Sequence, residues 1–156
     1  MLRRIAVMFK YKYQKLLDYQ KMLEEKAKEE LSSYVRMLGI AEKQLDRLAG
    51  VKYSYEKRLS EKQKNGESVN VLILYSEYIH RLENELYLQQ QEVEKIKSKI
   101  TTIKEKLLRL NKKRKILEKL QERAKANFVR EQEAEELKKL SEFAVHQFNK
   151  KNGNKL

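Results

Sequence analysis

The stretch that decides the fold runs from Leu72 to Phe128 and reads LILYSEYIHRLENELYLQQQEVEKIKSKITTIKEKLLRLNKKRKILEKLQERAKANF. One set of seventeen positions in it keeps alternating steps of three and four residues, and only Gln89, Arg114 and Gln121 among them are polar. The set is Leu72, Tyr75, Ile79, Leu82, Leu86, Gln89, Val93, Ile96, Ile100, Ile103, Leu107, Leu110, Arg114, Leu117, Gln121, Ala124 and Phe128. A mean step of 3.5 residues leaves one narrow stripe on a helix, which is buried by coiling against another helix.

The composition of the chain supports long helices. Its 156 residues contain no proline and four glycines, so little in the sequence interrupts a helix. Charged residues make up 38%, which is typical of coiled coils, whereas disordered segments lack a sustained stripe. The absence of cysteine excludes disulfides and fits a reducing compartment. No apolar run approaches the ~20 residues of a membrane span, and the stretch at residues 1–9 is too short for a secretion signal, so we expect a cytoplasmic protein.

Another stripe with the same step lies earlier in the chain; we call it the first stripe and the one from Leu72 to Phe128 the second stripe. Lys52 is the sole charged member of the first stripe. Its positions are Leu31, Tyr34, Leu38, Ala41, Leu45, Leu48, Lys52, Tyr55 and Leu59. Upstream, Phe9, Leu16, Leu23 and Ala27 are interpreted as its continuation, with a slip of one residue between Gln20 and Leu31. Such a slip changes the supercoil winding locally without ending a helix.

The two stripes are separated by the sequence KNGES at residues 64–68. Asn65 and Gly66 both tolerate a left-handed backbone, which commonly ends a helix, and Ser68 or Asn70 can cap the next one. We therefore predict a hairpin turn at 64–69. A short turn makes the helices antiparallel, so that residue i faces about residue 132 − i.

The predicted fold is all-α, a long two-helix antiparallel coiled-coil hairpin that forms one domain over residues 1–156. The first helix is expected at about 9–63 and the second at about 69–149, with a disordered tail at 150–156. The second helix is longer and overhangs the first. A stripe in this overhang has no partner within the chain and is interpreted as either a fraying tail or a docking helix: Leu137, Leu140, Ala144 and Phe148. The docking helix is favoured, because exposed phenylalanines cost free energy.

The net charge of +13 is unevenly distributed. Residues 1–21 carry six basic and one acidic side chain, residues 104–130 carry eleven basic and three acidic ones, and the remainder is neutral. The predicted hairpin brings both basic segments to its open end. Three interpretations remain: a solvated face, a surface for nucleic-acid phosphates, or an end that enters an acidic protein cavity. Nucleic acid is less favoured, because no recognition module is present and the stripe leaves no helix free to enter a groove.

No site for chemistry is visible in the sequence. His80 and His146 are far apart and lack metal-ligand spacing, and no glycine-rich phosphate loop occurs. Acidic pairs are abundant, but a two-helix rod has no pocket to shift their pKa values. We therefore expect no enzyme activity, no metal and no cofactor. Tyr53, Tyr78 and Tyr87 flank the stripe and are candidates for a partner surface.

Four stretches resemble, in the right order, segments of one protein family. They are FKYKYQKLLD at 9–18, YSEYI at 75–79 followed by Leu82, KKRK at 112–115 with LEKL at 117–120, and LSEFA at 140–144. Together with the length and the lack of proline, they resemble the FliJ family, small stalk proteins of the bacterial flagellar type III export apparatus. The resemblance covers nearly the whole chain.

The resemblance implies a non-enzymatic function in flagellum biogenesis, and hence in motility and chemotaxis. FliJ-like proteins are similar to the coiled coil of the rotary ATPase γ subunit. They insert their terminal end into the pore of the hexameric flagellar export ATPase, promote assembly of its ring and raise its activity. They also contact the export-gate membrane protein and bind export chaperones. This implies a cytoplasmic location, peripherally associated with the inner-membrane export apparatus, without a transmembrane segment.

Carried over to this sequence, the resemblance implies two sets of contact residues. Contacts with the ATPase ring fall on Tyr13, Lys15, Lys112, Arg114, Arg123 and Phe128. Contacts with the export gate fall on Tyr78, Leu82 and Gln89. Outside the family, the alternatives are a basic coiled coil that binds nucleic acid and a generic coiled-coil tether.

Overall fold

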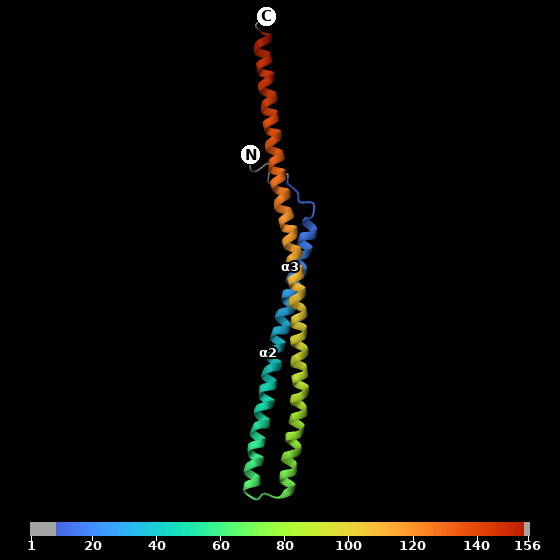
Figure 1. Ribbon diagram of the computed structural model, residues 1–156, viewed down its shortest axis with the longest axis vertical. Helices are drawn as coiled ribbons and strands as arrows, with labels where there is room; N and C mark the ends of the chain where they lie inside the picture. Colours follow the sequence, from blue (N-terminus) through green and yellow to red (C-terminus); the bar gives the residue numbers. More distant parts are fainter. Residues whose placement is uncertain (1–8, 155–156) are drawn as a thin grey trace. The chain divides into compact units, whose positions relative to one another are not determined.

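The computed structural model of the protein describes residues 9–154, which form two long α-helices without any strand. Helix α2 spans Gln14–Lys64 and helix α3 spans Val69–Gly153 (Figure 1). The predicted all-α hairpin with a longer second helix is confirmed. The residues before Phe9, which include most of the short apolar stretch at the start of the chain, lie outside the described range.

The helix ends differ from the expected bounds at the two termini. Helix α2 begins at Gln14 instead of residue 9, and the amide of Gln14 donates a hydrogen bond to the carbonyl of Tyr11 at 3.1 Å. Helix α3 continues to Gly153, so residues 150–153 of the expected tail are helical. No proline or glycine occurs between the turn and Gly153, so no residue in this stretch interrupts the helix. Lys150 and Lys151 in the last turn interact favourably with the helix dipole and stabilise the C-terminal end of α3.

The chain divides into two compact units, and both helices contribute to each of them. The hairpin unit comprises Glu24–Arg109 and includes the turn between the helices. The terminal unit comprises the described residues up to Leu23 and those from Leu110 onward. In the hairpin unit, a buried cluster on both helices is flanked by partly buried side chains of α2: Ala41, Val93, Ile96 and Ile100, with Leu31, Tyr34, Leu38 and Leu45 against them.

The pairing of α2 and α3 in the hairpin unit follows the predicted register. Tyr55, expected opposite residue 77, packs on Tyr75 and Tyr78 with ring centroids 5.7 and 4.5 Å apart. The side-chain amide of Gln89 donates a hydrogen bond to the backbone carbonyl of Ala41, which is expected opposite residue 91. These partners lie within two residues of the expected positions. These contacts confirm the predicted antiparallel pairing in the hairpin unit.

Phe9, in the terminal unit, departs from this register. The rule places it near Arg123, but its ring packs on Phe128 with the centroids 5.5 Å apart. Residues 9–13 precede α2 and are not helical. An extended residue advances ~3.3 Å and a helical one ~1.5 Å, so the non-helical residues before α2 carry Phe9 farther along α3 than a helix of the same length would.

The predicted stripes are confirmed from residue 31 onward. All seventeen positions between Leu72 and Phe128, and all nine between Leu31 and Leu59, are buried or half-buried. The predicted slip upstream is wrong. Leu17 is 1% exposed and Leu16 is 45% exposed, and the step of three and four continues without a fault from Leu17 through Gln20 and Glu24. The error arises because the polar residues Gln20 and Glu24 occupy two stripe positions there, and because Leu16, which was assigned to the stripe, is only the neighbour of the buried Leu17.

Lys52 is the one charged position of the first stripe, and its charge is compensated. Its Nζ lies 3.4 Å from a carboxylate oxygen of Glu56 on the same helix and 3.4 Å from one of Glu83 on α3. Partial burial disfavours the ammonium, but hydrogen bonding and attraction to the two carboxylates outweigh this and raise the pKa of Lys52 above its ordinary value of 10.5. Lys52 therefore remains protonated at neutral pH.

The polar positions of the second stripe are also hydrogen-bonded. Besides the bond from Gln89 to Ala41, the side-chain amide of Gln121 donates a hydrogen bond to the side-chain oxygen of Gln14 at 2.9 Å. Arg114 donates to Glu118, one turn along α3, at 2.8 Å. Because a half-buried polar group costs free energy unless it is paired, these partners explain how the stripe tolerates them.

The turn between the helices has the geometry that the Asn-Gly pair predicts. Gly66 has a φ of 72°, in the left-handed region. The amide of Gly66 donates to the carbonyl of Gln63 at 3.4 Å, and the amide of Glu67 donates to that of Lys62 at 3.1 Å. This is the Schellman pattern of helix ends, with glycine just after the cap. The carbonyl of Ser68 accepts the first bond of α3, from Leu72, at 3.2 Å.

Replacing Gly66 by alanine is expected to destabilise the protein by about 1 kcal/mol, because a Cβ disfavours the left-handed backbone. A Cβ at this position meets no atom within 4 Å, so backbone strain is the whole effect. The matched control is Gly50→Ala in the interior of α2, where a Cβ also meets nothing within 4 Å. That change is expected to stabilise the helix by about 1 kcal/mol. Urea unfolding followed by circular dichroism measures both, and equal effects of the same sign would contradict the assignment of the turn.

Candidate functional site

The described residues offer surfaces rather than an enclosed site. In this part of the chain, no group of three or more His, Cys, Asp or Glu side chains is placed to hold a metal ion. None of the helices between residues 9 and 154 is both long and apolar enough to cross a bilayer. The surfaces of the hairpin unit and of the terminal unit are considered in turn.

In the hairpin unit, the residues predicted to contact an export gate lie partly in the interface between the helices. Leu82 is only 3% exposed and belongs to the core. Tyr78 is half-buried against Tyr55, and Gln89 is half-buried through its bond to Ala41. The burial of Leu82 follows from its place in the stripe. The aromatic side chains that flank this surface and remain well exposed are Tyr53 and Tyr87, at 62% and 61%.

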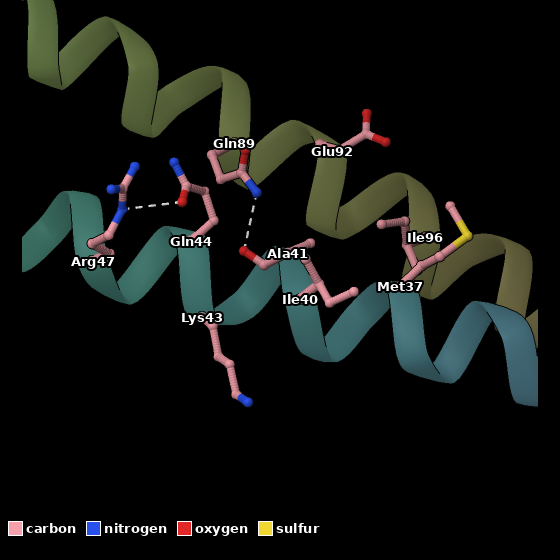
Figure 2. A pocket seen from close by; sticks show the side chains of 9 residues that line it. All are labelled: Met37, Ile40, Ala41, Lys43, Gln44, Arg47, Gln89, Glu92 and Ile96. Carbon is pink, nitrogen blue, oxygen red and sulfur yellow. Dashed lines mark hydrogen bonds between the residues drawn. The ribbon is translucent and has the colours of Figure 1, made fainter.

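A groove of about 620 Å³ lies beside Gln89 on the same unit. Figure 2 shows its wall on α2, where Ile40 and Met37 lie beside Ala41, and its wall on α3, formed by Gln89, Glu92 and Ile96. Ile40 is 71% exposed, although it is flanked by the buried Ala41. The sequence analysis did not single out this groove, because apolar residues one position away from a stripe carry no periodic signal.

In the terminal unit, α3 carries a row of basic side chains, which we call the outer basic row. Its members are Lys112, Lys115, Lys119, Arg123 and Arg130. They follow one another at steps of three, four, four and seven residues, which places them on one face of the helix, opposite the buried stripe. All five are exposed. The outer basic row is therefore a positive surface along one face, whereas the sequence analysis identified the basic segment 104–130 without assigning its side chains to a face.

The net positive charge is concentrated in two segments of the terminal unit. Residues 9–23 and 110–130 carry twelve basic and three acidic side chains, a net charge of +9. The whole hairpin unit carries seventeen basic and fifteen acidic side chains, a net charge of +2 over more than twice the length. Most of the two basic segments, residues 9–21 and 110–130, therefore lies within one compact unit, whereas residues 104–109 belong to the hairpin unit.

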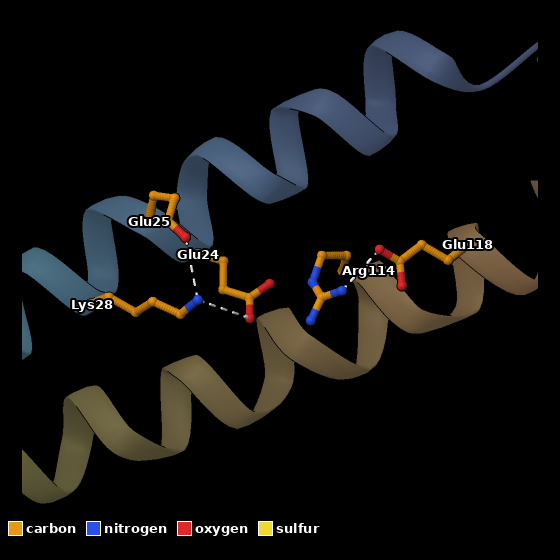
Figure 3. Close-up of polar contacts among 5 residues, drawn as sticks. All are labelled: Glu24, Glu25, Lys28, Arg114 and Glu118. Atoms are coloured by element: carbon orange, nitrogen blue, oxygen red, sulfur yellow. Dashed lines mark hydrogen bonds and ion pairs between the residues drawn. The ribbon is translucent and has the colours of Figure 1, made fainter.

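The residues predicted to contact an ATPase ring all lie in the terminal unit, but they divide into two kinds. Tyr13, Lys15, Lys112 and Arg123 are exposed, and Tyr13 is 44% exposed beneath the ammonium of Lys12. The other two are half-buried and have internal partners. Arg114 forms an ion pair with Glu118 at 2.8 Å (Figure 3). Phe128 packs on Phe9. Figure 3 also shows the exposed ion pair between Lys28 and Glu25 in the hairpin unit, at 3.2 Å.

Exposed apolar side chains accompany the basic ones in the terminal unit. On α3, Ile116 and Leu120 are 60% and 42% exposed, one turn apart and adjacent to the outer basic row. Near the start of α2, the partly exposed apolar side chains are Leu16, Tyr19 and Met22 on the helix and Tyr13 just before it. The sequence analysis missed this surface because it assigned Leu16 to the buried stripe. A mixture of apolar and basic side chains is typical of a surface that binds protein.

A hollow of about 590 Å³ lies at the start of α2 in the terminal unit. It is lined by aromatic, basic and amide side chains: Phe9, Lys10, Tyr11, Lys12, Gln14, Lys15 and Gln121. Tyr11 anchors this segment to α3, because its hydroxyl donates a hydrogen bond to the carbonyl of Leu117 at 2.9 Å. The segment before α2 thereby extends the positive surface of α3 with lysines held by aromatic anchors.

Comparison with known proteins identifies the family. The family model described as "Flagellar FliJ protein" matches residues 9–153, which is nearly the whole chain. Neither the comparison with curated proteins nor that with solved structures gives a match. The chain therefore belongs to the FliJ family of flagellar proteins, which are components of the flagellar export apparatus.

Proposed function

We propose that this protein is a non-enzymatic stalk of flagellar type III protein export. The terminal unit docks on the hexameric export ATPase, promotes assembly of its ring and raises its rate of ATP hydrolysis. The hairpin unit links the ATPase to the export gate in the membrane. Membership of the FliJ family supports this function, because the family belongs to the flagellar export apparatus.

The observation that carries the proposal is the surface of the terminal unit, where exposed Ile116 and Leu120 adjoin the outer basic row. Phosphate groups of a nucleic acid require the basic side chains but make no use of exposed isoleucine and leucine. A protein cavity with acidic walls and apolar contacts uses both. The surface thus favours an acidic protein partner over DNA or RNA.

The docking contacts that we propose on the ATPase are Tyr13, Lys15, Lys112, Arg114, Arg123 and Phe128. The exposed members of this set contact the ring directly. Arg114 and Phe128 hold the surface in shape, since Arg114 pairs with Glu118 and Phe128 packs on Phe9. Loss of either half-buried residue would displace its exposed neighbours.

For the export gate, we propose that Tyr78 and Gln89 mark the contact surface of the hairpin unit, with Leu82 supporting it from the core. Leu82 is too deeply buried for direct contact, at 3% exposed. The groove beside Ile40 is a second apolar surface of the same unit, suited to an export chaperone. Through these contacts the protein associates peripherally with the inner-membrane export apparatus.

The test is an ATPase assay with the flagellar export ATPase of the same organism. Adding the purified protein is expected to raise the rate of hydrolysis and the proportion of hexameric rings, and the concentration needed is expected to increase with salt. Short DNA or RNA in place of the ATPase serves as the comparison. Unchanged hydrolysis and ring assembly would refute the stalk function, and salt-sensitive nucleic-acid binding in their place would favour a nucleic-acid-binding coiled coil.

A further inference from the structure

The last part of α3 exposes a large amount of apolar surface. Every described residue from Glu133 onward is exposed. Five of them are large and apolar, with between 57% and 68% of each residue exposed: Leu137, Leu140, Phe143, Val145 and Phe148. Soluble proteins rarely leave a contiguous group of this kind in water, so such a group marks an interaction surface. We call residues 133–154 the C-terminal segment.

The apolar side chains of the C-terminal segment form a stripe of coiled-coil type. Leu137, Leu140, Ala144 and Phe148 follow one another at steps of three, four and four, which places them on one narrow face. Phe143 and Val145 lie on either side of it. A face of this width is complementary to one other helix with a stripe of the same length.

The charges around the stripe select the direction of that partner helix. Glu133 lies four residues before Leu137 and Lys151 three residues after Phe148, so both fall on the face of the stripe, which therefore has an acidic N-terminal side and a basic C-terminal side; Glu135, Lys139 and Lys150 fall on other faces. If a second copy packs antiparallel, Leu137 faces Phe148, and the acidic side of each copy faces the basic side of the other. If it packs parallel, glutamates face glutamates and lysines face lysines, which costs free energy.

We propose that the C-terminal segment is a self-association surface, on which a second copy of this chain packs antiparallel. The arrangement has two-fold symmetry, in which each contact occurs twice, so the acidic and basic sides form two matching sets of ion pairs. About twenty residues of each copy take part, which puts the interface at or below the ~1,200 Å² of weak and transient complexes. The dimer is therefore concentration-dependent. This inference does not depend on the proposed function.

Sedimentation equilibrium of the full chain without any partner tests the proposal, over protein concentrations from about 1 µM to 1 mM, which bracket weak association. The wild type is expected to pass from monomer to dimer. The variant Leu140→Glu/Phe148→Glu is expected to stay monomeric, because it places charges on the stripe. The matched control is Leu74→Glu, which changes a leucine of similar exposure in the hairpin unit and is expected to dimerise like the wild type.

A charge exchange tests the antiparallel direction. The variant Lys151→Glu is expected to raise the dissociation constant about tenfold, since glutamate then faces glutamate. Adding Glu133→Lys to it restores opposite charges across an antiparallel interface and is expected to restore dimerisation. In a parallel dimer like charges face each other in all three proteins, so the absence of this loss and rescue would overturn the proposal. A wild type that stays monomeric alone and binds only the export ATPase would also overturn it, and would show that the ATPase covers the stripe.

Discussion

The triple variant Lys112→Glu/Lys115→Glu/Lys119→Glu is expected to lose stimulation of the export ATPase almost completely. The three side chains form the start of the outer basic row, and all are exposed. Each reversal removes an attraction to an acidic surface and introduces a repulsion. At about 1 kcal/mol for each position, the three reversals raise the concentration required for half-maximal stimulation by roughly a hundredfold. A titration of the ATPase with the variant at low salt measures this shift.

The matched control changes the same net charge in the hairpin unit. Lys26, Lys95 and Lys106 are exposed lysines of that unit, and their reversal to glutamate should leave stimulation nearly unchanged. Circular dichroism checks that both variants retain the helix content of the wild type. Equal losses in the two triple variants would mean that only the total charge matters, and full stimulation by the first variant would refute electrostatic docking through the outer basic row.

The substitution Ile103→Asp is expected to cost at least about 4 kcal/mol of unfolding free energy, the largest stability effect of any single change described above. Ile103 is 2% exposed and belongs to the stripe that joins α3 to α2 in the hairpin unit. A carboxylate at this position loses its water without gaining an opposite charge. Because single domains are stable by about 5–15 kcal/mol, this loss approaches the total. Urea unfolding followed by circular dichroism measures it.

Two control substitutions separate burial from charge and from side-chain volume. Ser98→Asp introduces the same carboxylate on an exposed face of α3 and should change the unfolding free energy by less than about 0.5 kcal/mol. Ile103→Val removes one methylene group from the core and should cost about 1 kcal/mol. If Ile103→Asp unfolds at the same urea concentration as Ser98→Asp, the stripe is not the interface between the helices.

The fold could be predicted from the sequence because a two-helix coiled coil is almost entirely defined by local signals. The step of three and four identifies the buried face of each helix, and the Asn-Gly pair at 65–66 identifies the turn. Both predictions are confirmed, from the burial of the stripe positions and from the left-handed φ of Gly66. The antiparallel register then follows from the turn alone, without any knowledge of side-chain packing.

The start of the chain was less predictable, and the reason is that polar residues occupy stripe positions there. Gln20 is half-buried and Glu24 is 4% exposed, so a search for apolar residues alone moves to Leu16 and introduces a slip. The position of Phe9 depends on where α2 begins. The start of the helix at Gln14 is set by the anchoring of Phe9 and Tyr11 on α3, and such tertiary contacts leave no periodic signal.

The functional surface of the terminal unit was also predicted only in part. The basic segment at 104–130 is visible in the sequence, but it was not divided there into side chains on the outer face and side chains beside the stripe. Ile116 and Leu120 were missed, because only the stripe positions carry a periodic signal and these two apolar residues lie outside it.

The polar positions of the stripes bear on how the helices resist sliding past each other. Apolar steps repeat every seven residues, so a displacement of α2 by one heptad would leave leucine and isoleucine about as well packed as before. Lys52 would then meet Ser76 or Gln90 in place of Glu83, and Gln14 would meet Arg114 or Phe128 in place of Gln121. Each unit thus contains a polar contact between the helices that opposes a shift by one heptad. A force or torque applied to one helix is therefore transmitted to the other without a change of register.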